Sequence, residues 1–214
     1  MDLYRDFVGE GDLCFDVGAN VGRKTEALLS LGADVISFEP QPRCAEEIRL
    51  RCDGLGSLCV EMCAVGREQG EVYFDLNTRS GLAKVVSDPA ESEGEVVSVP
   101  VYPLDYFVEK YGVPEFCKID VEGHEMAVLE GLSSYPRSMS LEYHTREKSE
   151  VNEILEIINL LNNSYKNPVF NYTEGKNRFF SLNEFVEINV IKEKFCRRWR
   201  CMSGFGDLFV KEKK

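Results

Sequence analysis

The stretch DLCFDVGANVG, residues Asp12 to Gly22, decides the fold. Three apolar residues lead into Asp16, and a turn that contains Gly18 and Gly22 follows. A short apolar run bounded by glycine turns predicts a buried strand, and the apolar spacing of residues 23–31 predicts a helix. In an open α/β sheet, a ligand binds where such a strand ends and its helix begins.

The spacing within this loop indicates what kind of ligand it binds. The order Gly18-Ala-Asn-Val-Gly22 lacks the G-x-G-x-x-G spacing of dinucleotide-binding turns, which disfavours an NAD-linked oxidoreductase. Asp16 would repel a pyrophosphate but suits the ammonium and sulfonium groups of S-adenosylmethionine. A second apolar run ends at Glu39, where a carboxylate can hold the hydroxyl groups of a ribose. The alternative is a ligand-free turn in which Asp16 caps the helix.

The composition is that of an ordinary globular protein. The chain has 214 residues, 43% of them hydrophobic and 29% charged, which is enough for one α/β domain. Its formal net charge of −12 argues against a nucleic-acid partner, because nucleic-acid binding needs a basic surface. No apolar run approaches ~18 residues, so we expect no membrane span.

The chain carries eight cysteines but no C-x-x-C pair. Most of them lie in apolar strands or on an expected helix, where free thiols pack as small hydrophobic groups. The first residues also lack the charged and apolar pattern of a secretion signal. We therefore expect a reduced protein located in the cytoplasm.

Beyond the first helix, apolar strands alternate with helices, which predicts a mostly parallel sheet covered on both faces. The expected strands are 13–17, 35–39, 58–64, 116–121, 139–143, 169–172 and 207–210. The expected helices are 23–31, 43–52, 122–132 and 150–161. Residues 71–76 and 96–102 predict an added β hairpin, residues 65–66 a turn, and residues 173–206 show no clear pattern.

Three motifs give the chain a family resemblance. They are Asp16-Val-Gly-Ala-Asn-Val-Gly22, Phe38-Glu-Pro40 and Lys118-Ile-Asp-Val-Glu-Gly123, in this order. With them, the chain resembles the FkbM family of methyltransferases from about Leu13 to Tyr143. The resemblance implies the class I S-adenosylmethionine-dependent fold, a Rossmann-like, doubly wound seven-stranded sheet whose last strand is antiparallel. The family mostly methylates hydroxyl groups of sugars, polyketides and other natural products, with nitrogen as an alternative target.

The resemblance also implies which residues bind the cofactor S-adenosylmethionine. These are Asp16, Gly18, Asn20, Gly22, Glu39, Pro40, Ala64, Val65 and Asp120. Glu39 would hold the ribose, and Ala64 and Val65 would lie beside the adenine. Asp120 and Glu122 would face the reacting end of the pocket, and Glu122 would also contact the methyl acceptor. Ser80 belongs to a polar stretch that matches the family loosely and is a second candidate for binding the acceptor.

Methyl transfer to a hydroxyl requires that the protein positions the oxygen and removes its proton. His144 is our candidate for the general base, because it follows an expected strand end and an unperturbed imidazole titrates near neutral pH. Glu142 would orient the imidazole or bind the acceptor, and Asp120 completes the catalytic set. The alternative for His144 is a surface histidine without a catalytic role, and for His124 the structural role is the expected one.

Two further interpretations concern cations and anions. Asp120, Glu142 and His144 could instead bind a divalent cation, because carboxylates and imidazole are suitable ligands, although we expect no metal. The segment Cys196-Arg-Arg-Trp-Arg-Cys201 is basic, and Arg198 within it could bind an anionic group of the acceptor. The alternative there is a solvated charged stretch.

Together these interpretations predict one methyltransferase domain over residues 1–214. Its core would comprise about residues 12–172 and 207–210, with an insertion at 173–206. The expected reaction is S-adenosylmethionine-dependent O-methylation of a sugar, glycan or natural-product hydroxyl. The alternatives are N-methylation of a peptide or amide, and a non-catalytic nucleotide-binding module.

Overall fold

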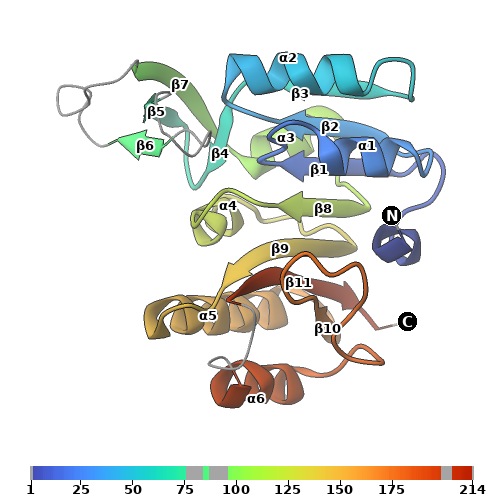
Figure 1. Cartoon of the computed structure of the whole chain (residues 1–214), viewed down its shortest axis with the longest axis vertical. Helices are drawn as coiled ribbons and strands as arrows, with labels where there is room; N and C mark the ends of the chain where they lie inside the picture. Colours follow the sequence, from blue (N-terminus) through green and yellow to red (C-terminus); the bar gives the residue numbers. More distant parts are fainter. Residues whose placement is uncertain (1, 76–83, 87–95, 199–203, 214) are drawn as a thin grey trace.

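The computed structural model describes residues 2–75, 84–86, 96–198 and 204–213, arranged as two sheets with helices around the larger one (Figure 1). The main sheet consists of β1 (Leu13–Val17), β2 (Asp34–Phe38), β3 (Leu58–Glu61), β8 (Phe116–Ile119), β9 (Ser138–His144), β10 (Pro168–Tyr172) and β11 (Phe205–Glu212). Their order across the sheet is β10-β11-β9-β8-β1-β2-β3. β11 is antiparallel to both of its neighbours, and the other pairings are parallel. The seven-stranded, mostly parallel sheet is therefore confirmed.

The helices are η1 (Asp2–Asp6), α1 (Arg23–Leu29), α2 (Pro42–Arg51), α3 (Leu104–Tyr111), α4 (Glu125–Glu130), α5 (Lys148–Ser164) and α6 (Ile188–Arg198). Apolar residues of α1 and α2 pack on one face of the main sheet. Those of α3, α4, α5 and α6 pack on the other face, around strand residues such as Phe38 and Ile119. Coverage of both faces explains why the strands are near-continuous apolar runs. None of the described helices is long and apolar enough to cross a bilayer.

The second sheet corrects one expected boundary. The apolar run 58–64 is not one strand, because β3 ends at Glu61 and the chain enters β4 (Ala64–Gly66), so Val65 and Gly66 lie in a strand rather than a turn. β4 pairs in parallel with β7 (Val96–Pro103), which pairs antiparallel with β5 (Gly70–Asp75), and β6 (Lys84–Val86) forms the edge. The added hairpin is confirmed and belongs to a four-stranded sheet.

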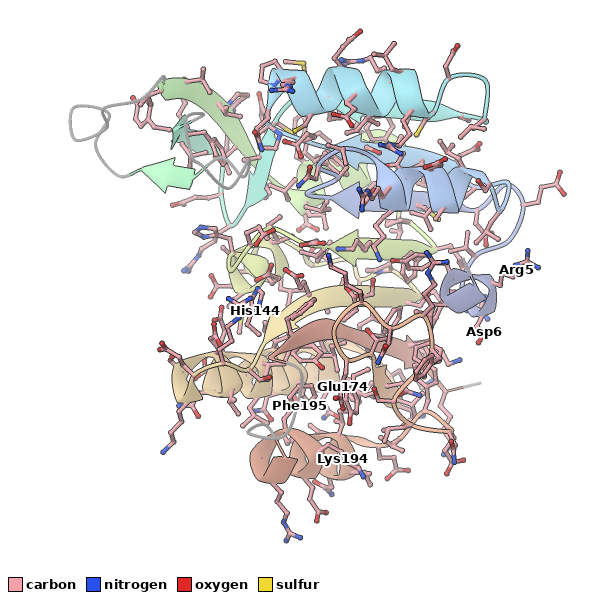
Figure 2. All side chains as sticks on the ribbon, viewed as in Figure 1. Arg5, Asp6, His144, Glu174, Lys194 and Phe195 are labelled. Carbon is pink, nitrogen blue, oxygen red and sulfur yellow. The ribbon has the colours of Figure 1, made fainter. Side chains whose placement is uncertain are left out.

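The segment that sequence patterns left unplaced connects β10 to β11 across both faces of the sheet. Phe180 and Phe185 pack edge-on against Phe7, on the face that α1 covers. The chain then forms α6, which the sequence did not predict. Phe195 of this helix projects toward the sheet, and its ring centroid lies 4.9 Å from that of Tyr143 (Figure 2).

Candidate active site

A cavity of about 960 Å³ opens at the carboxyl ends of β1, β2 and β8. This volume lies within the range of small-molecule sites, roughly 300–1,000 Å³. The second sheet stands at this edge of the main sheet and supplies the opposite wall, through residues 63–72, Phe74 and Val101 (Figure 1). Sequence patterns indicated a ligand at the strand ends, but only Ala64 and Val65 of this opposite wall.

Gly18 makes the closest approach in the loop between β1 and α1. Its φ is +76°, and a Cβ atom there would lie 1.8 Å from the carbonyl oxygen of Asp120. The backbone amides of Gly18 and Ala19 both donate hydrogen bonds to the carbonyl oxygen of Phe38, at 3.0 and 3.1 Å. Only glycine adopts this conformation at this distance without strain, so the loop stays flat against the ends of β2 and β8.

Glu39 lies at the cavity wall, and both oxygens of its side chain accept hydrogen bonds from backbone amides. Its Oε2 atom accepts a hydrogen bond from the amide of Asn20 at 2.7 Å, and its Oε1 atom accepts one from the amide of Gln41 at 2.9 Å. The residue is only 3% exposed. Burial raises the pKa of Glu39 more than these two hydrogen bonds lower it. Two fixed carboxylate oxygens with free lone pairs facing the cavity form a suitable acceptor for a diol.

Asp16 lies beneath the loop and not among the residues of the cavity wall. Strand alternation turns its side chain toward α1, where its Oδ2 atom accepts a hydrogen bond from Thr25 Oγ1 at 2.6 Å. In register, Asp16 lies between Ser37 of β2 and Lys118 of β8, and all three are buried. Burial raises the pKa of Asp16, and Lys118 opposes that shift. The sequence led us to expect direct contact with a cationic ligand; Asp16 lies outside the cavity wall, its Oδ1 atom is buried without a hydrogen-bond partner, and this role stays a prediction.

Gly22 also has a structural position, at the start of α1. It is the N-cap residue of α1 with a φ of +78°, and a Cβ atom there would lie 3.1 Å from the side chain of Ile48 in α2. It is not part of the cavity wall. The glycine therefore allows close packing between the two helices, whereas Gly18, Asn20 and Pro40 do line the cavity.

The buried Lys118 and the half-buried Asp120 form an ion pair at the end of β8. Lys118 is 1% exposed, and its Nζ atom donates a hydrogen bond to Asp120 Oδ2 at 2.5 Å. Burial acts to raise the pKa of Asp120, but the Lys118 ammonium more than offsets it and holds this pKa below its ordinary value. Burial likewise acts to lower the pKa of Lys118, and the surrounding carboxylates more than offset this. Asp120, which lines the cavity, is therefore ionised.

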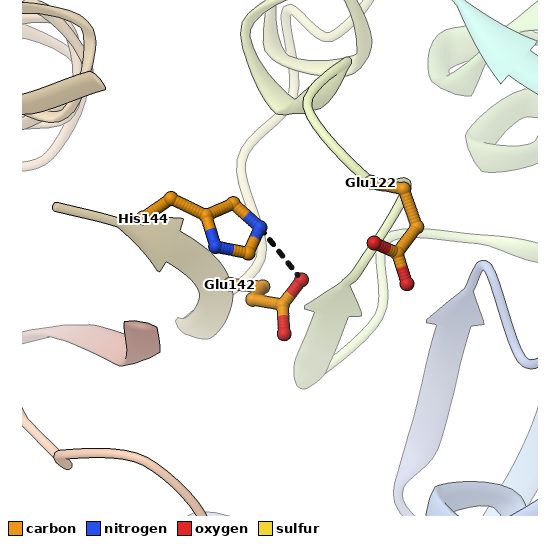
Figure 3. A group of neighbouring side chains, drawn as sticks. All are labelled: Glu122, Glu142 and His144. Atoms are coloured by element: carbon orange, nitrogen blue, oxygen red, sulfur yellow. Dashed lines mark ion pairs between the residues drawn. The ribbon is translucent and has the colours of Figure 1, made fainter. Parts of the chain in front are cut away.

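Glu142 and His144 lie together at the end of β9, with the imidazole Nε2 atom 3.4 Å from Glu142 Oε2 (Figure 3). Their side chains are 19% and 20% exposed. Burial raises the pKa of Glu142, and the neighbouring Asp120 charge adds to this. The Glu142 carboxylate raises the pKa of His144. Neither residue belongs to the cavity wall itself.

Glu122 connects this pair to the cavity. It lines the cavity from the connection between β8 and α4, and one of its carboxylate oxygens lies within 4.8 Å of ligand atoms of both Glu142 and His144 (Figure 3). Its φ of +54° sets the direction of its side chain. The sequence had grouped Asp120 with Glu142 and His144 as possible metal ligands. Among the described residues, the structure brings Glu122 into that group instead.

The remaining candidates lie elsewhere. Ser80 is outside the described residues. Arg198 is the last residue of α6, its side chain is outside the described part, and no described residue of α6 lines the cavity. His124, the N-cap residue of α4, does line the cavity, which the sequence analysis did not predict. The wall residues Glu71 and Val72 of β5 were missed as well, although the alternation that predicted their strand was visible.

Comparison with known proteins assigns the family. The family model described as "Methyltransferase FkbM domain" matches residues 16–167, which is more than half of the chain. The chain belongs to the FkbM methyltransferase family. Among curated proteins, hexuronic acid methyltransferase AglP from Haloferax volcanii is 28% identical over 134 residues. The match covers 61% of this FkbM chain and 54% of AglP, so the chain spans about half the length of that relative.

Solved structures show the same fold for this FkbM-family chain. An rRNA methylase from Streptococcus thermophilus superposes with a TM-score of 0.54 at 11% identity, covering 100% of this chain and 93% of that one. A candidate methyltransferase from Streptococcus mutans, solved in complex with SAH, gives 0.53 at 7% identity, covering 99% and 94%. At these identities the likeness establishes the fold alone, which is that of class I S-adenosylmethionine-dependent methyltransferases.

Proposed function

We propose that this chain transfers a methyl group from S-adenosylmethionine to a hydroxyl group of a sugar or glycan. The observation that carries the proposal is the Glu39 carboxylate, fixed by two backbone amides at the wall of a cavity of cofactor size. Membership of the FkbM methyltransferase family supports the reaction. The printed name of AglP, a hexuronic acid methyltransferase, supports a sugar as the acceptor.

The described residues fit the cofactor in two respects. Gly18 allows the loop to lie directly against the backbone of Asp120, and both Gly18 and Asn20 line the cavity. Glu39, together with Pro40, would accept hydrogen bonds from the ribose hydroxyls. Ala64 and Val65 offer an apolar edge for the adenine on the opposite wall. In this arrangement Gly22 supports the loop from beneath, and Asp16 lies beneath the loop with its Oδ1 atom still without a hydrogen-bond partner.

The acceptor end of the site would be formed by Asp120, Glu122, Glu142 and His144. When bound, S-adenosylmethionine supplies a methyl group that its positively charged sulfur has already activated. The chain then has to position the acceptor oxygen and take up the hydroxyl proton. Asp120, which Lys118 keeps ionised, is a weak base and suits hydrogen bonding to the acceptor. Glu142 and His144 have raised pKa values, which makes them the better proton acceptors.

The walls of the site favour a polyhydroxyl acceptor over a nucleic acid. The wall carries the carboxylates of Glu39, Glu68, Glu71, Asp120 and Glu122. With a formal net charge of −12 on the whole chain, a polyanion would be repelled. Ser80 and Arg198 stay candidates for acceptor contacts that the described residues do not address.

A methyl-transfer experiment tests the proposal. The chain is incubated with isotopically methyl-labelled S-adenosylmethionine and a panel of free sugars, uronic acids, glycosides and short peptides, and products are analysed by mass spectrometry. A sugar that gains one labelled methyl on oxygen supports the proposal, provided that Glu39→Ala abolishes the product. Label on a peptide nitrogen would replace the O-methylation proposal. Failure of the chain to bind the cofactor would leave a non-catalytic module as the function.

We also propose that the protein works in the cytoplasm. The described cysteines are free thiols, and Cys14 and Cys117 are fully buried between the sheet and its helices. Burial raises the pKa of Cys14 to about 12, so this thiol is unreactive at neutral pH. Free thiols of this kind fit a reducing compartment. Alkylation of the protein in intact cells, followed by mass spectrometry, would test this by counting reduced cysteines.

A further inference from the structure

Two glutamates and a histidine, all potential metal ligands, converge beside the cavity, which Glu122 lines. Glu122 comes from the connection between β8 and α4, and Glu142 and His144 come from the end of β9. One oxygen or nitrogen atom of each lies within 4.8 Å of the other two (Figure 3). Metal–oxygen and metal–nitrogen distances of about 2.0–2.2 Å place opposite ligands about 4.0–4.4 Å apart. Because Glu122 is exposed, a small rotation of its side chain would complete the set.

The atoms of this group lack the partners that a closed structural network would give them. Glu142 Oε2, which faces His144 Nε2, is buried without a hydrogen-bond partner. Buried polar atoms are normally satisfied, so unpartnered ones point to a missing ligand or ion. The contact between Glu142 and His144 is 3.4 Å long, and it leaves the Glu142 oxygen available.

The charges around the group favour a cation. Glu122, Glu142 and the nearby Asp120 bring three carboxylates to one place. The ammonium group of Lys118 is hydrogen-bonded to Asp120 and does not pair with the carboxylates of Glu122 and Glu142. Arg146 and Glu150 also act on His144, and their charges oppose each other. A bound cation would compensate the carboxylates that the protein itself leaves uncompensated.

We infer that Glu122, Glu142 and His144 bind one divalent cation of the Mn²⁺ type, whose remaining coordination positions face the cavity. Carboxylates suit Mg²⁺ and Mn²⁺, imidazole suits transition metals, and Mn²⁺ accepts both. Three protein ligands leave positions for two oxygens of a polyhydroxyl acceptor. A cation there would orient the acceptor and lower the pKa of the bound hydroxyl, so Glu142 and His144 would promote loss of the proton through the metal and not as its direct acceptors. This catalytic meaning rests on the proposed function, whereas cation binding itself can be measured without it.

The test is a titration of the metal-free chain with Mn²⁺ alone, followed by electron paramagnetic resonance of the unbound ion. We expect one Mn²⁺ per chain, and at least a tenfold weaker affinity in Glu122→Gln and in His144→Ala. His124→Ala is the matched control, because His124 also lines this end of the cavity but is not one of the three ligands. Its Mn²⁺ affinity should stay within twofold of the wild type. Glu122 is exposed, so Glu122→Gln keeps the test valid if His144→Ala does not fold.

The inference is wrong if the chain does not bind Mn²⁺. It is also wrong if neither Glu122→Gln nor His144→Ala changes the Mn²⁺ affinity. S-adenosylhomocysteine binding, measured by calorimetry on the same metal-free samples, separates this inference from the proposed function. A chain that binds S-adenosylhomocysteine but not Mn²⁺ refutes only the cation site. A chain that binds Mn²⁺ through these residues but no S-adenosylhomocysteine supports the cation site and refutes the proposed methyl transfer.

Discussion

The two halves of the carboxyl edge of the main sheet hold their carboxylates in different ways. In the first half, at the ends of β1 and β2, Glu39 is bound through both oxygens by backbone amides at 2.7 and 2.9 Å. In the second half, at the ends of β8 and β9, Glu142 Oε2 has no hydrogen-bond partner and faces an imidazole at 3.4 Å. The chain itself satisfies both oxygens of Glu39, whereas it leaves this oxygen of Glu142 without a hydrogen-bond partner.

This difference indicates that the two halves have different roles in ligand binding. A group fixed by backbone amides is preorganised and loses little freedom when a ligand binds. A group whose polar atoms lack hydrogen-bond partners within the chain can gain them from a ligand or an ion. We therefore expect the cofactor to bind to the first half without any contribution from the second, and the acceptor to depend on both.

Lys118→Met should give the largest effect, because Lys118 is the cation shared by both halves. It is hydrogen-bonded to Asp120 and lies beside Asp16, and its removal takes the main compensating charge from the buried Asp16 and the half-buried Asp120. Removal of one partner from a buried pair costs about 3–5 kcal/mol. Urea unfolding should show this loss of stability. Lys110→Met is the control, because Lys110 pairs with Glu61 on the surface, and it should change stability much less. Equal effects would contradict the role given to Lys118.

Gly18→Ala should disrupt the loop of the first half where it packs against the end of β8. Gly18 and Gly54 have similar positive φ angles, +76° and +70°, so alanine at either position costs ~1–2 kcal/mol of backbone strain. Only at Gly18 does the new Cβ atom collide with backbone, 1.8 Å from the Asp120 oxygen, whereas nothing lies within 4 Å at Gly54. Calorimetry should therefore show more than tenfold weaker S-adenosylhomocysteine binding in Gly18→Ala. Gly54→Ala should bind like the wild type, and a similar loss in both variants would refute the collision.

Cofactor affinity should depend on pH through Glu39. The ionised carboxylate accepts the ribose hydrogen bonds, so affinity is full above the pKa of Glu39 and falls as pH drops through it. Burial raises this pKa above 4.5, so the fall should begin at a higher pH than for an ordinary glutamate. Glu39→Gln should weaken binding about 10- to 100-fold, since a hydrogen bond to a charged group contributes ~1.5–3 kcal/mol. It should also flatten the pH profile, and a profile that keeps its shape would exclude Glu39 as the titrating group.

Glu122→Gln should have the smallest effect on binding and stability. Glu122 is exposed and belongs to the second half, so the free energy of unfolding should change by no more than about 0.5 kcal/mol. S-adenosylhomocysteine affinity should stay within twofold of the wild type, whereas methyl transfer should decrease. Thermal melting, calorimetry and the product assay measure these three quantities on one sample. If Glu122→Gln lost as much cofactor affinity as Glu39→Gln, the claim that the cofactor binds to the first half alone would be wrong.

The sequence predicts the first half better than the second, for a physical reason. Apolar runs that end in Asp16, Glu39 and Asp120 mark strand ends, and parallel strands bring their carboxyl ends to the same edge. What the pattern does not give is the direction of each side chain. Asp16 sits on the strand face that α1 covers, which follows from its pairing with Ser37 and Lys118 and not from its position at a strand end.

The missed features depend on tertiary contacts. Glu122 joins Glu142 because its φ is +54°, and such a value is unusual for a residue other than glycine. The break between β3 and β4 lies inside one apolar run, and only pairing with β7 sends Ala64 into a second sheet. Helix α6 carries its buried apolar residues, Ile191 and Phe195, among many charged ones, and these two become a recognisable face only when they are buried against the sheet.

One calorimetric comparison tests the central claim most directly. S-adenosylhomocysteine is titrated into the wild type, Glu39→Ala and His144→Ala, with NAD as a second ligand. Our account predicts binding of one S-adenosylhomocysteine per wild-type chain, at least tenfold weaker binding by Glu39→Ala, and nearly unchanged binding by His144→Ala. Binding of NAD in place of S-adenosylhomocysteine, or full affinity in Glu39→Ala, would contradict it.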